Sequence, residues 1–402
     1  MTYLHLFSWN PLGNPGGMET VINITAKAQA ELGHIVFVVG RKQGLTTKVI
    51  ETKINNVNYI QVQHRFKRRP STLKINLAGY ALLFGEVFFT LIVLTPVILK
   101  LVRQKKVDAV LFYGIHLFGI SPLIRLLGSK TVLLFEALQR SPFVSIWHPL
   151  YWFRQLKYAS FNVIFTPADQ YYYADGTHID NFSLLKKYAR FTKIYCFPWG
   201  IEVEELLKIT QSEKFKKLKR DKKVKIIICP RRLVEEKGVT FLVEAIPSIL
   251  KKNPNLLFVF TSDGVLKQTL KERVKTLGIS KNVIFTGNLP YKQVLQIIKS
   301  SDLLVAPSSG EELFGMVFLE AYVLKTPIVT TKFGGIPNVV HDKKTGILVP
   351  PRNSDKLASA IEFILSHKEI AREMVEAGYK LVHKEYTLQR TVENIDKAVA
   401  QL

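Results

Sequence analysis

The sequence predicts an α/β protein built from two doubly wound domains that face each other across a cleft. Three observations lead to this: the length, the alternation of strand-like and helical patterns, and the restart of that alternation near residue 220. A chain of 402 residues exceeds what one ordinary hydrophobic core serves, so two domains of roughly 200 residues are expected. With 47% hydrophobic and 22% charged residues, the composition is that of a folded globular protein.

The first alternation opens at the N-terminus. YLHLFSW is strand-like, TVINITAKAQAEL has helical periodicity, and HIVFVVGR is strand-like again. This is the order of a βαβ unit and predicts a parallel sheet, in a domain that we place at residues 1–198. The N-terminal run lacks a basic segment followed by a long apolar one, so it indicates a first strand rather than a signal peptide.

The second alternation begins with KVKIIICP and continues through GVTFLVEAIPSIL, NLLFVFTSDG, NVIFTGNL and DLLVAPSS to TPIVTTKFGG. Fully apolar strands separated by helices indicate a sheet that is covered on both faces. We expect this domain to span residues 199–383. Ligands of doubly wound sheets bind at the carboxyl ends of the strands, and the candidate residues below all follow predicted strands.

The net charge of +24 favours partners that carry phosphate, whether nucleic acid, anionic lipid or a diphosphate substrate. We expect no nucleic-acid partner, because no helix-turn-helix, zinc-finger or RNA-recognition signature accompanies the charge. Cys196 and Cys229 lie in strand-like apolar runs. This favours buried, reduced thiols and a cytoplasmic protein.

The segment from Leu77 to Leu99 carries one charged residue, Glu86, over a length that could cross a bilayer. Five Lys or Arg residues precede it between His64 and Lys74. Three interpretations are open: a buried helix of the first domain, an interfacial helix that docks on an anionic membrane surface, and a membrane span. The span is least favoured, because both domains must occupy one compartment. The expected location is cytoplasmic and peripheral, at the inner membrane face.

The stretch GEELFGMVFLEAY carries two carboxylates, Glu312 and Glu320, around an apolar run with a helical pattern. Glu312 precedes the helix, where a carboxylate interacts favourably with the helix dipole. Glu320 lies among apolar residues, where an ionised group is costly unless something bonds to it. At ~1.5 Å rise per residue the two can lie up to about 12 Å apart. The residues alone leave two alternatives, a structural pair or a pair that binds a hydroxyl-rich ligand such as a nucleotide diphosphate sugar.

Two cations and a helix start are candidates for holding a diphosphate. The stretch PRRLVEEKGV supplies Arg232 and Lys237 after a strand. A guanidinium with an ammonium can stabilise charge that builds on a leaving diphosphate. The predicted helix start near Phe314 adds free backbone donors. These donors belong to Gly315, Met316 and Val317.

In the first domain, NPLGNPGGMETV is a glycine-rich turn between a strand and a helix. The absence of side chains at Gly16 and Gly17 lets backbone N–H groups approach a phosphate or sugar oxygen. A tight turn without a ligand is the alternative interpretation.

Taken in order, NPGGMETV, FPWGIEVEEL, PRRLVEEKGV, SSDLLVAPSSGEELFGMVFLEA and TPIVTTKFGGIPNVV resemble the retaining GT-B glycosyltransferases of family 4, the glycosyl transferases group 1. The resemblance covers nearly the whole chain. It implies two Rossmann-like domains, a nucleotide diphosphate sugar as donor, no cofactor, no metal, and transfer with retention of anomeric configuration. It also implies that a C-terminal helix, residues 384–402, returns to the N-terminal domain.

The resemblance assigns roles to residues that match the family's motifs. Glu312 would touch the transferred sugar and Glu320 the nucleoside ribose, as the family's E-x7-E pair. Arg232 and Lys237 would bind the diphosphate and, with Glu312, carry catalysis. The remaining implied contacts are the backbone of Phe314, Gly315, Met316 and Val317 on the donor and the Gly16–Gly17 loop on the acceptor side.

The chain departs from the family where relatives carry a His-Gly pair, since it has LLFEALQR there. Glu136 or the more distant His116 could take that histidine's role, or no residue does. Asn338 stands where relatives usually have Glu. These departures leave the catalytic detail and the choice of sugar open.

The sequence therefore predicts a hexosyltransferase that uses a nucleotide diphosphate sugar and an acceptor hydroxyl. The basic segment and the apolar helix of the first domain favour a membrane lipid-linked glycan or glycolipid as acceptor. Two alternatives are a sugar-nucleotide epimerase of the same architecture and a non-catalytic donor-binding partner in a glycan assembly. Donor base, sugar, linkage and oligomeric state are not fixed by the sequence.

Overall fold

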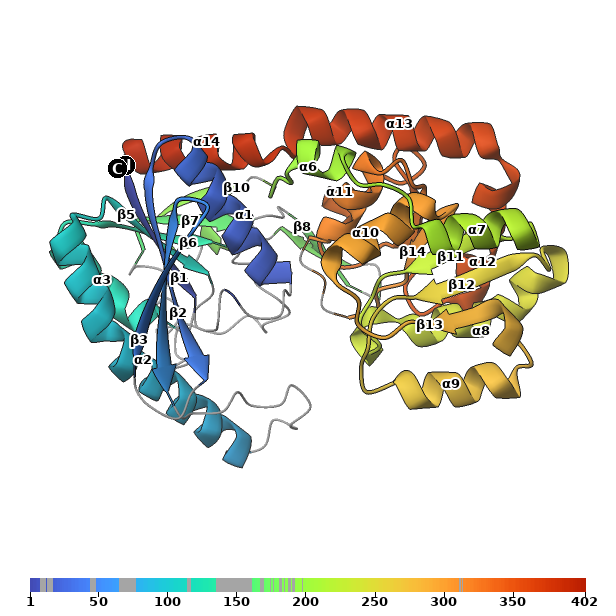
Figure 1. Cartoon of the computed structure of the whole chain (residues 1–402), viewed down its shortest axis with the longest axis horizontal. Coiled ribbons are helices and arrows are strands. Elements are labelled where there is room, and N and C mark those ends of the chain that lie inside the picture. The colour runs from blue at the N-terminus through green and yellow to red at the C-terminus, as the bar shows by residue number, and fades with distance from the viewer. Residues whose placement is uncertain are drawn as a thin grey trace. The chain divides into compact units, whose positions relative to one another are not determined.

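The computed structural model groups the chain into two compact units (Figure 1). Unit 1 comprises Met1–Pro167, Phe182–Phe197 and Leu388–Leu402, and unit 2 comprises Ala168–Asn181 and Pro198–Thr387. The structure describes residues 1–7, 12, 17–43, 48–64, 77–113, 117–134, 161–166, 170–173, 175, 177–180, 183, 185–186, 189, 192–196, 198–310, 312 and 314–402.

Unit 1 is built on a sheet in which the described strands have the order β10-β7-β6-β5-β1-β2-β4-β3. Neighbouring strands are parallel except for the β3–β4 pair, which is antiparallel. The apolar runs of the sequence form its centre. The strands are β1 (Thr2–Phe7), β2 (Ile35–Gln43), β3 (Val49–Ile54), β4 (Val57–His64), β5 (Ala109–Tyr113), β6 (Lys130–Leu134), β7 (Val163–Thr166) and β10 (Lys193–Cys196).

The C-terminal helix α14 is part of unit 1, where it lies against α1 (Figure 1). Asp396 holds it to the sheet, because its carboxylate accepts a hydrogen bond of 2.6 Å from Tyr3 Oη and lies 2.9 Å from His34 Nε2. The helices of unit 1 are α1 (Gly17–Glu31), α2 (Leu77–Lys105), α3 (Ser121–Leu126) and α14 (Leu388–Ala400).

Helix α2 contains the long apolar segment. In its C-terminal half, Leu94, Ile98 and Leu101 are buried in the core of unit 1, while Ile92 and Lys100 are exposed. That half therefore packs as a core helix. Within the described part of the chain, no helix has both the length and the apolar character needed to cross a membrane.

Unit 2 is built on a parallel sheet with the order β13-β12-β11-β14-β15-β16. Numbered along the chain, this is 3-2-1-4-5-6, the Rossmann order, in which the direction of strand addition reverses between β11 and β14. The strands are β11 (Lys225–Cys229), β12 (Leu256–Phe260), β13 (Val283–Phe285), β14 (Leu303–Ala306), β15 (Ile328–Thr331) and β16 (Ile347–Val349).

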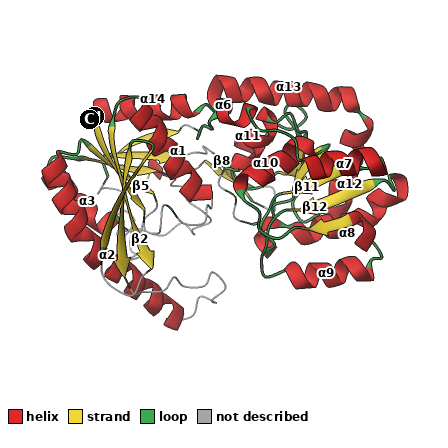
Figure 2. Ribbon diagram, in the orientation of Figure 1, coloured by secondary structure: helices red, strands yellow, loops and turns green. Residues whose placement is uncertain are grey.

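Helices cover both sides of this sheet, as the apolar strands predict (Figure 2). On one side, α8 and α12 pack together on Phe258 and Val305, and their buried residues form one core. The helices are α6 (Val203–Leu207), α7 (Glu213–Lys222), α8 (Val239–Lys252), α9 (Lys267–Thr276), α10 (Tyr291–Ser300), α11 (Met316–Val323), α12 (Ser354–Ser366) and α13 (Lys368–Glu385).

The hairpin of β8 (Gln170–Tyr172) and β9 (His178–Asp180) belongs to unit 2, although the sequence analysis places it in the N-terminal domain. Tyr172 and Gly334 exchange backbone hydrogen bonds of 3.0 and 2.8 Å. Asn338 Nδ2 also donates to the Gln170 carbonyl at 2.8 Å. Asn338, a departure from the family pattern, thus has a structural contact in this chain.

The two cysteines lie in different surroundings. Cys229 is buried at the end of β11, and burial raises the pKa of its thiol to about 12. Cys196 is exposed, which corrects the expectation that both thiols are buried. The reason is its position at the end of β10, the edge strand of the sheet in unit 1.

Gly378 allows α13 to pass close to α11. A Cβ at this position would lie 2.2 Å from Cδ1 of Tyr322, whose ring is fully buried and whose hydroxyl bonds to Thr345. We expect Gly378→Ala to destabilise unit 2 in urea unfolding. Overpacking costs about 1–3 kcal/mol, whereas the higher helix propensity of alanine stabilises the helix by only about 1 kcal/mol. Glu373→Ala, at an exposed site of α13, is the control. A Gly378→Ala chain as stable as the parent would contradict this packing.

Candidate functional site

The candidate site lies where strand order reverses in unit 2, at the carboxyl ends of β11 and β14. The loops that follow these strands are joined by backbone hydrogen bonds. Ser309 and Gly310 donate their N–H groups to the Glu236 carbonyl at 3.0 and 2.8 Å, and Ser309 Oγ donates to the Glu235 carbonyl at 3.1 Å. This contact fixes the loop that carries the cations against the loop that carries Glu312.

Gly238 makes the close approach of the two loops feasible. Its φ is +64°, and an added Cβ would lie 1.9 Å from the carbonyl oxygen of Pro307. A side chain at this position would therefore be strained and would also force the loops apart. Gly238 ends the short 3₁₀ turn Glu235–Lys237 and precedes α8.

Glu312 is the centre of a buried charge cluster. Its Oε2 accepts from Lys237 Nζ at 3.2 Å and Ser308 Oγ at 3.3 Å, and it lies 3.1 Å from Arg231 Nη1. Among the described residues, Oε1 has no hydrogen-bond partner. Burial alone would raise the pKa of Glu312, but Arg231 and Lys237 outweigh it, so the pKa lies below the ordinary value. The carboxylate is ionised at neutral pH.

Arg231 is the buried arginine of the site, and the sequence analysis did not select it. Its side chain is 10% exposed, whereas that of Arg232 is 59% exposed and pairs with Glu236 at 3.2 Å. Arg232 therefore lies in the site loop but not in the Glu312 cluster. The only sequence signal was the doubled arginine of PRRL, which does not say which of two consecutive side chains turns inward.

Glu320 lies in α11 and is 8% exposed. Tyr291 Oη, at the start of α10, donates to its Oε1 at 2.8 Å. Burial raises the pKa of Glu320 to about 6, although the hydrogen bond from Tyr291 and the charge of Arg231 lower it. Tyr291 gave no signal in the sequence, because it contacts Glu320 only through the packing of two helices.

The start of α11 carries backbone donors. Gly315 is the N-cap residue, with φ +91°, and Phe314 before it is buried with its ring 5.9 Å from that of Tyr386. In the described structure, the N–H groups of Gly315, Met316 and Val317 have no acceptor. Orphan N–H groups at a helix start, with the positive end of the helix dipole, suit an anion.

The other predicted residues cannot be placed in this cluster. Gly16, His116 and Glu136 lie outside the described residues, and Gly17 is the first residue of α1. No group of three or more His, Cys, Asp or Glu side chains in the described parts of the chain is arranged to hold a metal ion.

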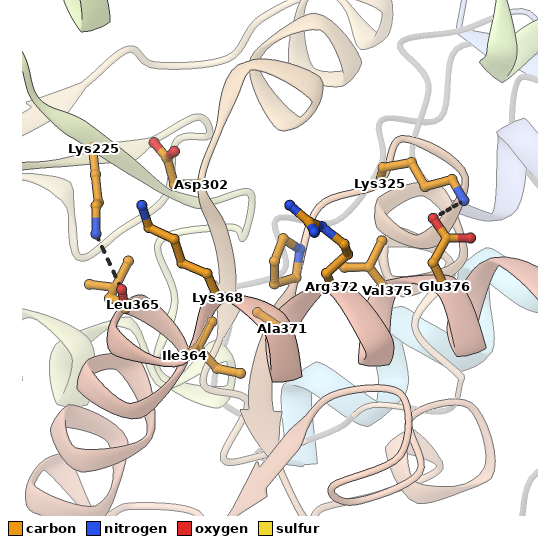
Figure 3. Close-up of a pocket in the computed structure, with 11 residues that line it drawn as sticks. Lys225, Asp302, Lys325, Ile364, Leu365, Lys368, Ala371, Arg372, Val375 and Glu376 are labelled. Carbon is orange, nitrogen blue, oxygen red and sulfur yellow. Dashed lines mark hydrogen bonds and ion pairs between the residues drawn. The ribbon is translucent and has the colours of Figure 1, made fainter.

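A cavity of about 430 Å³ lies at the opposite, amino-terminal ends of the strands of the same sheet (Figure 3). Lys225 begins β11 there and Asp302 precedes β14. Charged side chains that line the cavity have partners. Lys225 Nζ donates to the Leu365 carbonyl at 3.2 Å, and Lys325 pairs with Glu376 at 2.8 Å. None of the predicted site residues lines this cavity, so it is separate from the candidate site.

The chain is similar in sequence to known proteins. Residues 210–381 match the family model described as Glycosyl transferases group 1. Alpha-D-kanosaminyltransferase of Streptomyces kanamyceticus is 30% identical over 163 residues, 40% of this chain and 42% of that protein. GDP-mannose-dependent alpha-(1-6)-phosphatidylinositol monomannoside mannosyltransferase of Mycolicibacterium smegmatis is 28% identical over 159 residues, 38% of this chain and 42% of that protein. The matches thus span about two fifths of these relatives.

Solved structures resemble the whole chain. Sucrose-phosphate synthase from Thermosynechococcus elongatus superposes with a TM-score of 0.76 at 17% identity, over 100% of this chain and 98% of that chain. Anabaena Alr3699/HepE in complex with UDP and glucose superposes with a TM-score of 0.71 at 16% identity, over 100% of both chains. The chain has the GT-B fold, as predicted. In sequence, the match to the glycosyl transferases group 1 family model covers residues 210–381, less than half of the chain.

The raised pKa of Glu320 predicts a pH-dependent cost in stability. The folded state binds this proton more tightly than the unfolded chain, so stability falls as pH rises from 4.5 through about 6. The difference between the ordinary pKa of 4.5 and the folded-state pKa of about 6 corresponds to about 2 kcal/mol of unfolding free energy. Relative to the parent, Glu320→Gln should gain about that much unfolding free energy between pH 4 and pH 7.5, measured by urea unfolding.

Glu213→Gln, at a side chain that is 86% exposed, controls for the loss of a carboxylate. A stability difference between Glu320→Gln and the parent that does not change with pH would show that Glu320 titrates as an ordinary carboxyl group.

Proposed function

We propose that the protein is a glycosyltransferase that moves a hexose from a nucleotide diphosphate sugar to an acceptor hydroxyl. The observation that carries this proposal is the cluster at the carboxyl ends of β11 and β14. There the ionised Glu312 contacts Lys237, and the buried Glu320 follows eight residues later in a helix with free N–H donors at its start. The family of residues 210–381 supports the same assignment.

In this proposal each part of the donor has a partner. The diphosphate binds the N–H groups of Gly315, Met316 and Val317, together with Lys237 and Arg232. The free Oε1 of Glu312 accepts from a sugar hydroxyl, and Glu320 accepts from the ribose, where the Tyr291 hydroxyl now bonds. A structural neighbour solved with UDP and a relative named as GDP-mannose-dependent favour a uridine or guanosine donor.

The reaction exchanges one bond at the anomeric carbon. The acceptor oxygen bonds to this carbon, the bond to the diphosphate oxygen breaks, and the hydroxyl proton leaves with the diphosphate. Lys237 and the N–H groups of α11 stabilise the charge that develops on the leaving group. We further propose transfer with retention and without a metal or cofactor, in line with the family resemblance.

We propose a lipid-linked acceptor at an anionic membrane surface, with the protein peripheral at the cytoplasmic face. Unit 1 supports this with exposed apolar side chains on α2 and α3, where Ile92 is 55%, Leu123 44% and Leu126 83% exposed. Exposed Arg125 and Lys100 lie on the same two helices. Apolar side chains beside cations are typical of surfaces that bind anionic lipids. A mannosyltransferase relative is named for a phosphatidylinositol mannoside.

Calorimetry with uridine, guanosine and adenosine diphosphate sugars tests donor binding. We expect one donor to bind the parent chain, and Lys237→Ala to weaken binding by roughly tenfold or more, since a charge-assisted hydrogen bond is lost. Lys252→Ala, which breaks an exposed pair with Glu362, should bind as the parent does. Absence of binding to any donor would contradict the proposal.

Incubation with donor alone separates the enzyme classes. An epimerase would release an isomerised nucleotide sugar without an acceptor, and a non-catalytic partner would bind the donor but neither isomerise nor transfer it. Transfer to a lipid-linked acceptor, with release of nucleoside diphosphate, is the outcome that the proposed function predicts.

Flotation with vesicles of anionic phospholipid tests the membrane surface. We expect the parent chain to float at low salt and to be released by high salt, because the cations of unit 1 contribute. Leu126→Glu should reduce flotation severalfold. Val265→Glu, at a 64% exposed site of unit 2, is the matched control. Equal flotation of Leu126→Glu and Val265→Glu would contradict the role proposed for the exposed apolar side chains of unit 1.

A further inference from the structure

Arg231 lies near both carboxylates of the site. Its Nη1 is 3.1 Å from Glu312 Oε2, and its guanidinium carbon is 5.1 Å from the centre of the Phe318 ring. Phe318 precedes Glu320 by two residues in α11. The arginine thus contacts one carboxylate directly and packs on the helix that carries the other.

In the described part of the chain, Arg231 does not use all of its hydrogen-bond donors, which is unfavourable for a buried residue with a purely structural role. Its Nε and Nη2 are buried and have no hydrogen-bond partner among the residues that the structure describes. Burying unpaired donors is unfavourable, so packing alone does not account for an arginine here. What the guanidinium does supply is a fixed positive charge directed at Glu312 through Nη1.

The orientation of Glu312 follows from this contact. Arg231, Lys237 and Ser308 all engage the same oxygen, Oε2. In the described structure Oε1 accepts no hydrogen bond. The three groups therefore fix the orientation of the carboxylate and leave one of its oxygens available as an acceptor. Because Arg231 contacts Oε2, a ligand need not displace it to reach Oε1.

We propose that Arg231 is a positioning residue, which holds Glu312 through Oε2 and so presents Oε1 to a hydroxyl of the transferred sugar. This inference rests on the proposed function, since it names a residue of the same site. Arg231 acts through Glu312 and does not touch the donor. Arg232, its neighbour, keeps the separate role of an exposed cation at the loop surface.

The charge of Arg231 also reaches both carboxylates. It lowers the pKa of Glu312, together with Lys237 and Ser308, and it lowers the pKa of Glu320, together with the hydroxyl of Tyr291. Loss of this charge should therefore raise the pKa of both groups. The change is measurable without any ligand.

The first experiment follows the carboxyl carbons of ¹³C-labelled glutamate by NMR as pH is changed, with signals assigned through Glu312→Gln and Glu320→Gln. We expect Arg231→Gln to move both titrations to higher pH and Arg231→Lys, which keeps the charge, to return them toward the parent. Arg273→Gln, which breaks a surface pair with Glu244, is the control and should leave them in place. Titrations that stay unchanged in Arg231→Gln would overturn the inference.

The second experiment measures donor affinity against pH by calorimetry. Arg231→Gln should bind the donor roughly tenfold or more weakly at neutral pH, with partial recovery in Arg231→Lys. The losses from Arg231→Gln and Glu312→Gln should not add in the double variant, because the arginine acts through the carboxylate. Additive losses would contradict the positioning role. A parent chain that binds no donor would instead contradict the proposed function, and the ligand-free titrations distinguish the two failures.

Discussion

The contact between the loops after β11 and β14 is the interaction on which the site depends. Two backbone N–H groups, from Ser309 and Gly310, share the carbonyl of Glu236, and Gly238 lets the chains approach to the distance that these bonds require. Without this contact, Lys237 and Glu312 would belong to two separate loops. With it, a charge cluster forms where the strand order of the doubly wound sheet reverses, which is where such sheets generally bind ligands.

The two carboxylates differ because their surroundings supply different numbers of positive charges. Glu312 contacts Arg231 and Lys237, which outweigh burial and keep it ionised. Glu320 is equally buried, but its direct partner is the neutral Tyr291, so its pKa rises to about 6. Glu312 is ionised at neutral pH and takes up a proton only below the ordinary pKa of a carboxyl group, whereas Glu320 is ionised only above mildly acidic pH. Because their pKa values are shifted in opposite directions, two similar side chains can have different roles in binding one ligand.

The fold was predictable because it follows from periodicity and length, and the residues after strand ends indicated the site. Sequence reasoning did not reach contacts that form only in three dimensions. It selected Arg232 for the diphosphate and did not select Arg231, whose side chain turns inward to Glu312. It missed Tyr291, which reaches Glu320 from another helix. Periodicity specifies which face of an element is buried, but not which polar side chain of a loop turns toward a distant partner.

A segment outside the residues that match the family also supports the site. Tyr172, in the hairpin that the sequence analysis assigned to the first domain, pairs with Gly334 through two backbone hydrogen bonds. The adjacent Gly335 donates its N–H to the carbonyl oxygen of Glu312 at 2.8 Å. The backbone of Glu312 is thus fixed by a turn that Tyr172 holds in place, while its carboxylate is fixed by Arg231 and Lys237. Residues from both halves of the sequence therefore position one carboxylate, which explains why the site cannot be reduced to a local motif.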